Sequence, residues 1–206
     1  MKTRFRRYLP LYVLLALTVL PVTAAYIAYY VLPPSNRTNY GSLIEPQRPL
    51  PVLPLATLDG AAFDLRELRG SWVLVMVDGA ECDANCADKL LMMRQQRTMT
   101  GKDRDRIERV WLITDQAPLP IILMREYEGT RFIRAPLQPL RDFLALPELS
   151  DAQLSDHIWV IDPRGNLMLR WPKDPQINGV KRDIARLLKA AGGWIVIDPR
   201  GRSRLR

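Results

Sequence analysis

Residues 72–86 read WVLVMVDGAECDANC, and this stretch contains the pattern that decides the fold. Its first six residues are all apolar, which is typical of a strand buried on both faces of a sheet. An Asp-Gly pair ends the apolar run, and Cys82 and Cys86, the two cysteines of the chain, follow it. A helix is predicted over 83–99, so both cysteines lie where a buried strand turns into a helix.

Outward from this turn, strands and helices alternate along the chain. Further strands are predicted at 107–114, 157–162 and 167–171, with short extended segments at 52–57 and 61–65. A helix is predicted at 177–190, where apolar residues recur at helical spacing, and a less regular one at 119–127. The segment 117–155 otherwise reads as a connecting insertion. This alternation predicts an α/β fold, with a mixed sheet that has helices on its faces.

The N-terminal part of the chain predicts a membrane anchor. Residues 9–32 include no charged side chain. As a helix they would span about 36 Å, against roughly 30 Å for the hydrocarbon core of a bilayer. Four basic residues precede the span, so the N-terminus is expected to stay in the cytoplasm while the rest is exported. A cleaved signal peptide is the alternative, because residues 22–24 fit a small-residue cleavage site, but the apolar run is long for one.

The charge distribution argues against a nucleic-acid partner. The formal net charge is +8. Most of it lies before the apolar segment and in the arginine-rich last residues, which leaves the region between them close to neutral. A basic face on the domain, the usual footprint of nucleic-acid binding, is therefore not expected.

Composition divides the chain into five parts. They are a basic cytoplasmic N-terminus at 1–8, a transmembrane helix at 9–32, a linker rich in Pro, Ser, Asn and Gly at 33–51, a globular domain at 52–191, and a basic C-terminal tail at 192–206. The tail repeats the hexapeptide VIDPRG of residues 160–165 at 196–201. Two copies are too few for a repeat fold, so the second copy predicts either an extra edge strand or a solvated tail.

The cysteine pair suits both redox and metal chemistry. A thiol at a helix N-terminus feels the positive end of the helix dipole, which favours the reactive thiolate, although the carboxylates at 78, 81 and 83 oppose it. Residues i and i+4 of a helix have Cβ atoms about 5–6 Å apart, whereas a disulfide needs about 3.5–4.5 Å. A Cys82–Cys86 disulfide therefore requires Cys82 to lie just outside the helix, or local unwinding. An inert structural disulfide is the third alternative in an oxidising compartment.

The order of these features resembles the Sco/SenC proteins. The resemblance rests on the strand, the Cys-x-x-x-Cys turn and the helix, followed by Asp156-His157, an apolar strand and the Asp-Pro-x-Gly turn at 162–165. The residues 39–41 and the turn at 162–168 are similar to a bacterial set of Sco-like transmembrane proteins associated with cytochrome c oxidase. The resemblance covers about residues 39–190. It implies a thioredoxin-like mixed sheet flanked by helices and preceded by one transmembrane helix.

The resemblance also implies the site residues. In the Sco family two cysteines and one distal histidine bind copper. Carried over residue by residue, the pair is Cys82 and Cys86 and the third ligand is His157, the single histidine of the chain. Soft thiolates with an imidazole suit copper. A structural role for His157, at the loop end just before its strand, is the alternative.

The function that follows is a membrane-anchored accessory factor for cytochrome c oxidase assembly. It would bind copper, reduce thiols, or do both through the Cys-x-x-x-Cys site, with a subunit of the oxidase as its partner. Its expected location is the bacterial inner membrane, with the domain in the periplasm. Two alternatives stay open: a metal-independent thiol–disulfide oxidoreductase and a non-catalytic docking scaffold.

Overall fold

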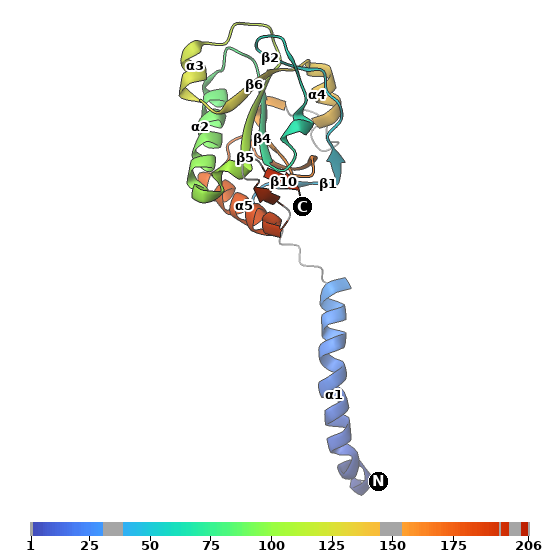
Figure 1. Cartoon of the computed structure of the whole chain (residues 1–206). Helices are drawn as coiled ribbons and strands as arrows, with labels where there is room; N and C mark the ends of the chain where they lie inside the picture. Colours follow the sequence, from blue (N-terminus) through green and yellow to red (C-terminus); the bar gives the residue numbers. More distant parts are fainter. Residues whose placement is uncertain (1, 31–38, 145–153, 194, 198–202, 206) are drawn as a thin grey trace. The chain divides into compact units, whose positions relative to one another are not determined.

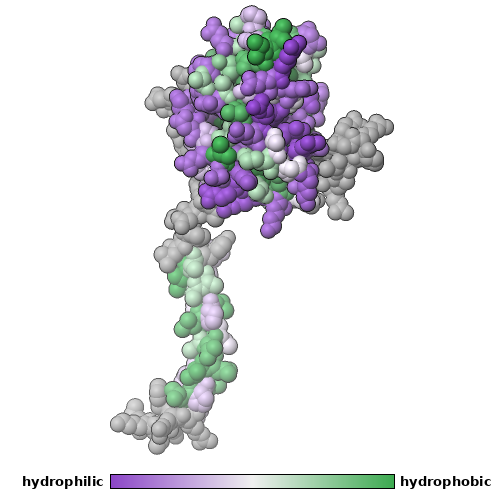
Figure 2. Space-filling model, turned by 90° about the vertical axis from the view of Figure 1, so that its left-hand side faces the viewer, coloured by the Kyte–Doolittle hydropathy of each residue, from purple (hydrophilic) through white to green (hydrophobic). Residues whose placement is uncertain are grey.

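The computed structural model describes residues 2–30, 39–144, 154–193, 195–197 and 203–205. The chain forms two compact units, Met1–Thr38 and Asn39–Arg206. In the first unit, helix α1 (Lys2–Tyr30) includes Pro10 and Pro21. Its segment Tyr8–Ala28 is long and apolar enough to cross a membrane. Most side chains on the face of this helix seen in Figure 2 are apolar, and large apolar residues are exposed along its length, as expected for a helix that meets lipid rather than a protein core.

The second unit is built on a mixed sheet (Figure 1). Its described strands are β1 (Ser42–Pro49), β2 (Leu55–Thr57), β3 (Ala62–Phe63), β4 (Trp72–Asp78), β5 (Ile107–Ile113), β6 (Thr130–Arg134), β7 (Ile158–Ile161) and β8 (Asn166–Trp171). Their order across the sheet is β1-β8-β7-β4-β5-β6-β2-β3. Strand β4 runs parallel to β5 and antiparallel to β7, and β7 forms an antiparallel pair with β8. The apolar run of the cysteine-bearing stretch is thus the central strand, as predicted.

Helices cover both faces of this sheet. They are α2 (Ala84–Met99), α3 (Ile121–Glu126), α4 (Leu137–Leu144), α5 (Ile177–Ala190) and the short 3₁₀ helix η1 (Leu65–Leu68). Alternate residues of β4 point to opposite faces, so one strand serves two cores. Leu74 and Met76 pack in the core under α2 and α5. Val73, Val75 and Val77 pack in the core under η1 and α4.

The predicted linker is wrong at its C-terminal end, because residues 42–49 form β1. This strand pairs antiparallel with β8 at one edge of the sheet. Among its residues only Ile44 is buried, and Pro46 and Pro49 interrupt any alternation of apolar and polar residues. An edge strand with a single buried side chain leaves no period-2 signal, so its composition reads as a linker.

The segment 117–155 also contains more structure than its sequence predicts. Helix α3 lies within the predicted 119–127, but β6 and α4 were not expected. Strand β6 has the sequence TRFIR and pairs in parallel with β5. It has only five residues, two of them arginines, so its membership in the sheet follows from tertiary pairing rather than from hydrophobic pattern.

The second copy of the VIDPRG motif begins a small hairpin. Within the described residues, β9 (Ile195–Ile197) pairs antiparallel with β10 (Ser203–Leu205) in a two-stranded sheet of its own. The first copy, by contrast, ends β7 and turns into β8. The residues between β9 and β10, which include the Pro-Arg-Gly of the second copy, lie outside the described residues.

A buried carboxylate ties the start of the domain to its last helix. Asp183 of α5 accepts hydrogen bonds from the backbone N–H groups of Tyr40 at 2.9 Å and Gly41 at 2.8 Å. It also accepts one from Trp171 Nε1 at 3.1 Å. These three donors satisfy a carboxylate that is 1% exposed. The chain entering the domain is thereby fixed against both α5 and β8.

Candidate redox site

The two cysteines form a disulfide in the turn between β4 and α2. Their Cα atoms are 5.0 Å apart. Cys82 precedes the helix and has a φ of 47°, in the left-handed region that non-glycine residues rarely adopt. Cys86 lies in the first turn of α2. The bond therefore closes in the way that the i, i+4 spacing requires, with the first cysteine outside the helix.

Asp83 fixes the helix end between the cysteines. Its backbone is extended, and its side chain accepts a hydrogen bond from the Cys86 N–H at 2.9 Å. This is an N-cap, which satisfies one of the free N–H groups of the first helical turn. Because the capped N–H belongs to Cys86, the cap holds the second cysteine in place directly.

The loop before Cys82 is held by the neighbouring strand end. Asp115 lies two residues beyond the end of β5, and its Oδ2 accepts a hydrogen bond from the Ala80 N–H at 2.9 Å. Gly79 allows this approach, because a Cβ there would lie 2.7 Å from the same oxygen. Asp78 accepts a bond from the Gly79 N–H at 2.9 Å. Two carboxylates at adjacent strand ends thus fix the turn that presents the disulfide.

The two sulfur-bearing residues differ in exposure. Cys86 is 0% exposed and packs in the core with Leu90 and Met93. Cys82 is only partly buried, at the edge of the same core. An incoming thiol or disulfide therefore has access to Cys82, while Cys86 is shielded by the helix to which it belongs.

A buried ion pair lies one helical turn further along α2. Lys89 is 2% exposed, and its Nζ lies 2.8 Å from Asp78 Oδ2. The ammonium also donates to the carbonyl oxygen of Ser155. Neither Lys89 nor its partner was predicted as a site residue, because a lysine on a helix is usually solvated. The available signal was its spacing, three residues after Cys86 and next to the buried Leu90.

His157 lies directly before β7, and its ring contacts a residue of the other core. The ring contacts Trp159 edge to face, with centroids 5.6 Å apart, and Trp159 packs in the core under α4. Nδ1 donates to the Trp171 carbonyl oxygen at 2.9 Å, and Arg170 Nη1 lies 3.4 Å from Nε2. Both ring nitrogens therefore have protein partners. Burial lowers the pKa of the imidazole, while the Trp171 hydrogen bond acts in the opposite direction.

Of the predicted copper ligands, Cys82 and Cys86 are bonded to each other, while the His157 ring contacts Trp159, Trp171 and Arg170. Across the described residues, no group of three or more His, Cys, Asp or Glu side chains is placed to hold a metal ion. This oxidised arrangement does not fit a two-cysteine, one-histidine copper site.

Fold and site together define a class. A central strand that leads into a cysteine pair at a helix N-terminus, in a mixed sheet covered on both faces, is a thioredoxin-like domain. The chain matches the family model described as "Transmembrane-like, thioredoxin-like, C-terminal domain" over residues 72–191, and it belongs to that family. No curated protein matches it.

Solved structures show the same fold at low sequence identity. Yeast Sco1 with copper bound is 16% identical, with a TM-score of 0.55, over 71% of this chain and 96% of that one. Apo Sco1 from Thermus thermophilus is 14% identical, with a TM-score of 0.57, over 75% and 99%. A candidate protein disulfide isomerase from Bacteroides thetaiotaomicron is 17% identical, with a TM-score of 0.54, over 75% and 96%. At these identities the likeness shows the Sco-like fold alone.

Proposed function

We propose that the chain is a membrane-anchored thiol–disulfide exchange factor that acts on a cysteine-bearing subunit of cytochrome c oxidase during assembly. The unequal exposure of the two sulfurs carries this proposal, because exchange needs one accessible cysteine and one shielded, nearby cysteine. The resemblance of the sequence to Sco/SenC proteins supports the choice of partner. The basic residues before α1 support an orientation with the domain in the periplasm of a bacterial inner membrane.

The exchange involves two sulfur displacements. The thiolate of reduced Cys82 attacks a disulfide of the partner, and the partner's second sulfur leaves as a thiolate that takes a proton from water. Cys86, deprotonated, then attacks Cys82, which re-forms the bond seen here and releases the partner's first sulfur, which is protonated in turn. Two electrons pass to the partner. To complete a cycle, an external dithiol must reduce the Cys82–Cys86 disulfide with two new electrons.

Trapping in cells tests this proposal. A Cys86→Ser chain is expected to accumulate mixed disulfides through Cys82, because the resolving thiol is missing. A Cys82→Ser chain is expected to accumulate far fewer, since Cys86 is buried. Nonreducing gels and mass spectrometry identify the adducts. An absence of adducts, in a chain whose disulfide also fails to equilibrate with dithiothreitol, would contradict the exchange.

Oxidase assembly in cells that express a double variant tests the scaffold alternative. A docking module that needs no sulfur chemistry would support full oxidase assembly in cells that express a Cys82→Ser, Cys86→Ser double variant. Under the exchange proposal, oxidase activity falls in those cells while the level of the variant protein stays normal.

Copper as a cargo of the reduced pair is the second candidate. Reduction would leave two thiolates on residues with Cα atoms 5.0 Å apart, and thiolates favour Cu(I). The position of the His157 ring supports a site made by the cysteines alone. Anaerobic Cu(I) titration of the reduced full-length chain is expected to show binding that Cys82→Ser abolishes and His157→Ala leaves within about threefold. A loss of binding in His157→Ala would instead support the three-ligand site.

A further inference from the structure

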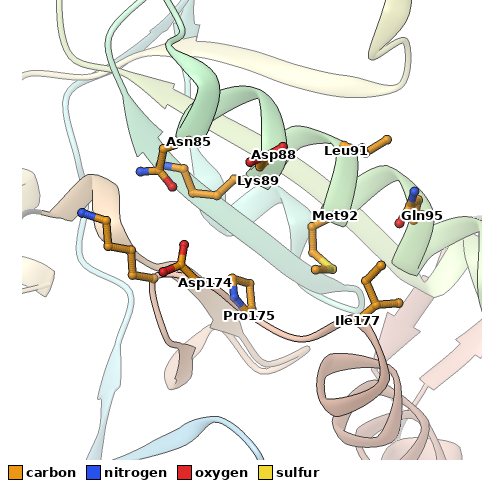
Figure 3. Close-up of a pocket in the computed structure, with 10 residues that line it drawn as sticks. Asn85, Asp88, Lys89, Leu91, Met92, Gln95, Asp174, Pro175 and Ile177 are labelled. Carbon is orange, nitrogen blue, oxygen red and sulfur yellow. The ribbon is translucent and has the colours of Figure 1, made fainter.

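A groove runs along α2 beside the disulfide. It has a volume of about 330 Å³ and lies between α2 and the segment that joins β8 to α5 (Figure 3). That volume is at the lower end of the range for ligand-binding pockets, about 300–1,000 Å³. Asn85, Asp88 and Met92 line the groove from α2. Asp174, Pro175 and Ile177, the first residue of α5, line it from the opposite side.

The groove begins within one helical turn of the disulfide. Asn85, which lines it, immediately precedes Cys86 and follows Cys82 by three residues. A polypeptide bonded to the Cys82 sulfur therefore has the groove within reach of its neighbouring residues. The groove belongs to the surface that an exchange partner meets.

The cationic side chains of the groove are already neutralised. Lys89 forms its ion pair with Asp78 beneath the helix. Lys173 lies 2.9 Å from Asp156, which raises the pKa of the lysine. Neither ammonium leaves a net positive charge for an incoming acidic group.

Among the carboxylates beside the groove, Asp83 and Asp174 contribute to the raised pKa of Lys173, but the ion pair of this lysine is with Asp156. Within the described part of the chain, Asp88 and Asp174 form no hydrogen bond or ion pair with their side chains, and both residues are exposed. Glu81 and Asp83 are also exposed beside the disulfide. This end of the domain is therefore acidic, although the chain as a whole carries +8. A partner with basic side chains is favoured here and an acidic one is opposed.

The floor of the groove is apolar. Met92 of α2 faces Pro175 and Ile177 across it (Figure 3). Methionine is unbranched and adapts to side chains of different shape. An apolar side chain lying between these three residues would leave water, which is the main source of affinity for such a contact.

We infer that this groove seats an extended segment of the partner protein that carries basic side chains next to its reactive cysteine and an apolar side chain directly beyond them. The inference rests on the proposed exchange at Cys82, and it adds the residues that would select the partner. Asp88 and Asp174 recognise the basic side chains, and Met92 and Ile177 contact the apolar one.

Exchange kinetics with two matched peptides test the groove. The protein is the full-length Cys86→Ala chain in a nonionic detergent, with Cys82 as its single thiol. The probes are Ala-Cys-Lys-Lys-Leu-Ala and Ala-Cys-Glu-Glu-Leu-Ala, each with its cysteine activated by 5-thio-2-nitrobenzoate, whose release is followed by absorbance. The basic peptide is expected to react about tenfold faster at low ionic strength, and the difference shrinks at high salt.

Variants assign the effect to the groove. Asp88→Asn with Asp174→Asn is expected to reduce the preference to less than about threefold, whereas Glu67→Gln, an exposed charge in η1 on the other face, leaves it unchanged. Neutral 2-hydroxyethyl disulfide should react equally with all three chains. The inference about the groove is overturned if the chain reacts normally with this probe but shows no preference between the peptides. It is also overturned if the Asn variants keep the preference. Failure of Cys82 to react even with the small probe overturns the exchange proposal itself.

If the Cys86 variants do not fold, a binding measurement on the wild-type chain tests the groove instead. The oxidised wild-type chain is titrated with a fluorescent Ala-Ser-Lys-Lys-Leu-Ala peptide, which cannot exchange. Anisotropy is expected to show salt-sensitive binding that the Asp88→Asn, Asp174→Asn chain loses by about tenfold. Equal affinity in the two chains would contradict the inference without any use of the thiols.

Discussion

Cys82 shows how one residue determines the chemistry of this site. Its left-handed backbone places it outside α2, while the N-cap on Asp83 starts the helix directly after it. The chain thereby presents an accessible cysteine next to a buried one. In a regular helix the two thiols would be at equivalent depth on one face, and nothing would distinguish the attacking sulfur from the resolving one.

Burial of His157 makes the stability of the domain depend on pH. The pKa of the folded imidazole is below its ordinary 6.5, mainly because of desolvation. Below pH 6.5 the unfolded chain therefore binds a proton that the folded chain does not. The free energy of unfolding consequently decreases as the pH is lowered. The stability contribution is complete above about pH 6.5. It is lost as pH falls toward the folded pKa, with a slope of at most about 1.4 kcal/mol per pH unit.

Urea unfolding of the detergent-solubilised chain at pH 7.5, 6.5 and 5.5 measures this effect. All five tryptophans lie after residue 71, so their fluorescence reports on the domain. His157→Gln is expected to be less stable than the wild type at pH 7.5, with a difference that narrows at pH 5.5. Parallel pH profiles for the two chains would show that the imidazole does not account for the slope.

Lys89 is expected to stabilise the cysteine turn through its contacts with Asp78 and Ser155. Lys89→Met keeps the length of the side chain but leaves a partly buried carboxylate without its cation. Removing one partner of a fully buried pair costs about 3–5 kcal/mol, and since Asp78 keeps some exposure to water we expect about 1–3 kcal/mol. Urea unfolding measures the loss, with Lys181→Met on the exposed face of α5 as the control. A Lys89→Met chain as stable as the wild type would show that desolvation cancels the ion pair.

At the scale of elements, α5 holds the chain that enters the domain. Gly179 is buried in this helix, and a Cβ there would lie 2.5 Å from the ring of Tyr40. The Tyr40 hydroxyl accepts a hydrogen bond from the Gln176 N–H at 2.9 Å, at the start of the same helix. Together with Asp183, these contacts join residues that are far apart in the sequence.

Gly179→Ala is therefore expected to destabilise the domain, although alanine is the better helix former. The intrinsic gain is about 1 kcal/mol, whereas overpacking costs about 1–3 kcal/mol and here involves a ring held at both ends. Thermal unfolding measures the change in stability. Tyr40→Ala should remove the clash with the new Cβ, so the double variant is expected to be more stable than the sum of the two single effects predicts. A Gly179→Ala chain more stable than the wild type would mean that the ring moves aside without cost.

At the scale of the whole molecule, α1 and the domain need opposite environments. Every residue of Tyr8–Ala28 whose burial is described is exposed, so this helix has no protein core to cover it. The domain has two cores of its own, one on each face of the sheet. This division suits a helix in lipid and a domain in water.

We expect alkaline phosphatase fused to the C-terminus to be active in a Gram-negative host, because that enzyme needs an oxidising compartment. Replacing Lys2, Arg4, Arg6 and Arg7 by Gln should lower the activity several-fold, since these residues set the orientation. The mass of the purified chain should include residues 1–24. A mature chain that begins at residue 25 would show a cleaved signal peptide instead of an anchor.

Local patterns in the sequence predict the apolar N-terminal helix, the central strand, α2, α5 and the place of both cysteines between strand and helix. Each of these has a local signal: an uncharged run long enough for a bilayer, an apolar run of strand length, or apolar residues at helical spacing. The order of motifs also indicated the family. Residues 42–49 and 130–134 escaped prediction because they are short segments without a clear period. Residues 137–144 have apolar side chains at helical spacing, but they form only two turns within a proline-rich stretch.

The assembly of the candidate site depends on contacts between distant parts of the chain, which the structure shows. It set the His157 ring against Trp159, buried Lys89 against Asp78, and set Asp115 beneath the cysteine turn. The sequence names the single histidine as the natural third ligand, yet which face of a sheet a side chain takes depends on pairing with distant strands. A one-residue change of register reverses that face, and no local pattern around one histidine records the register.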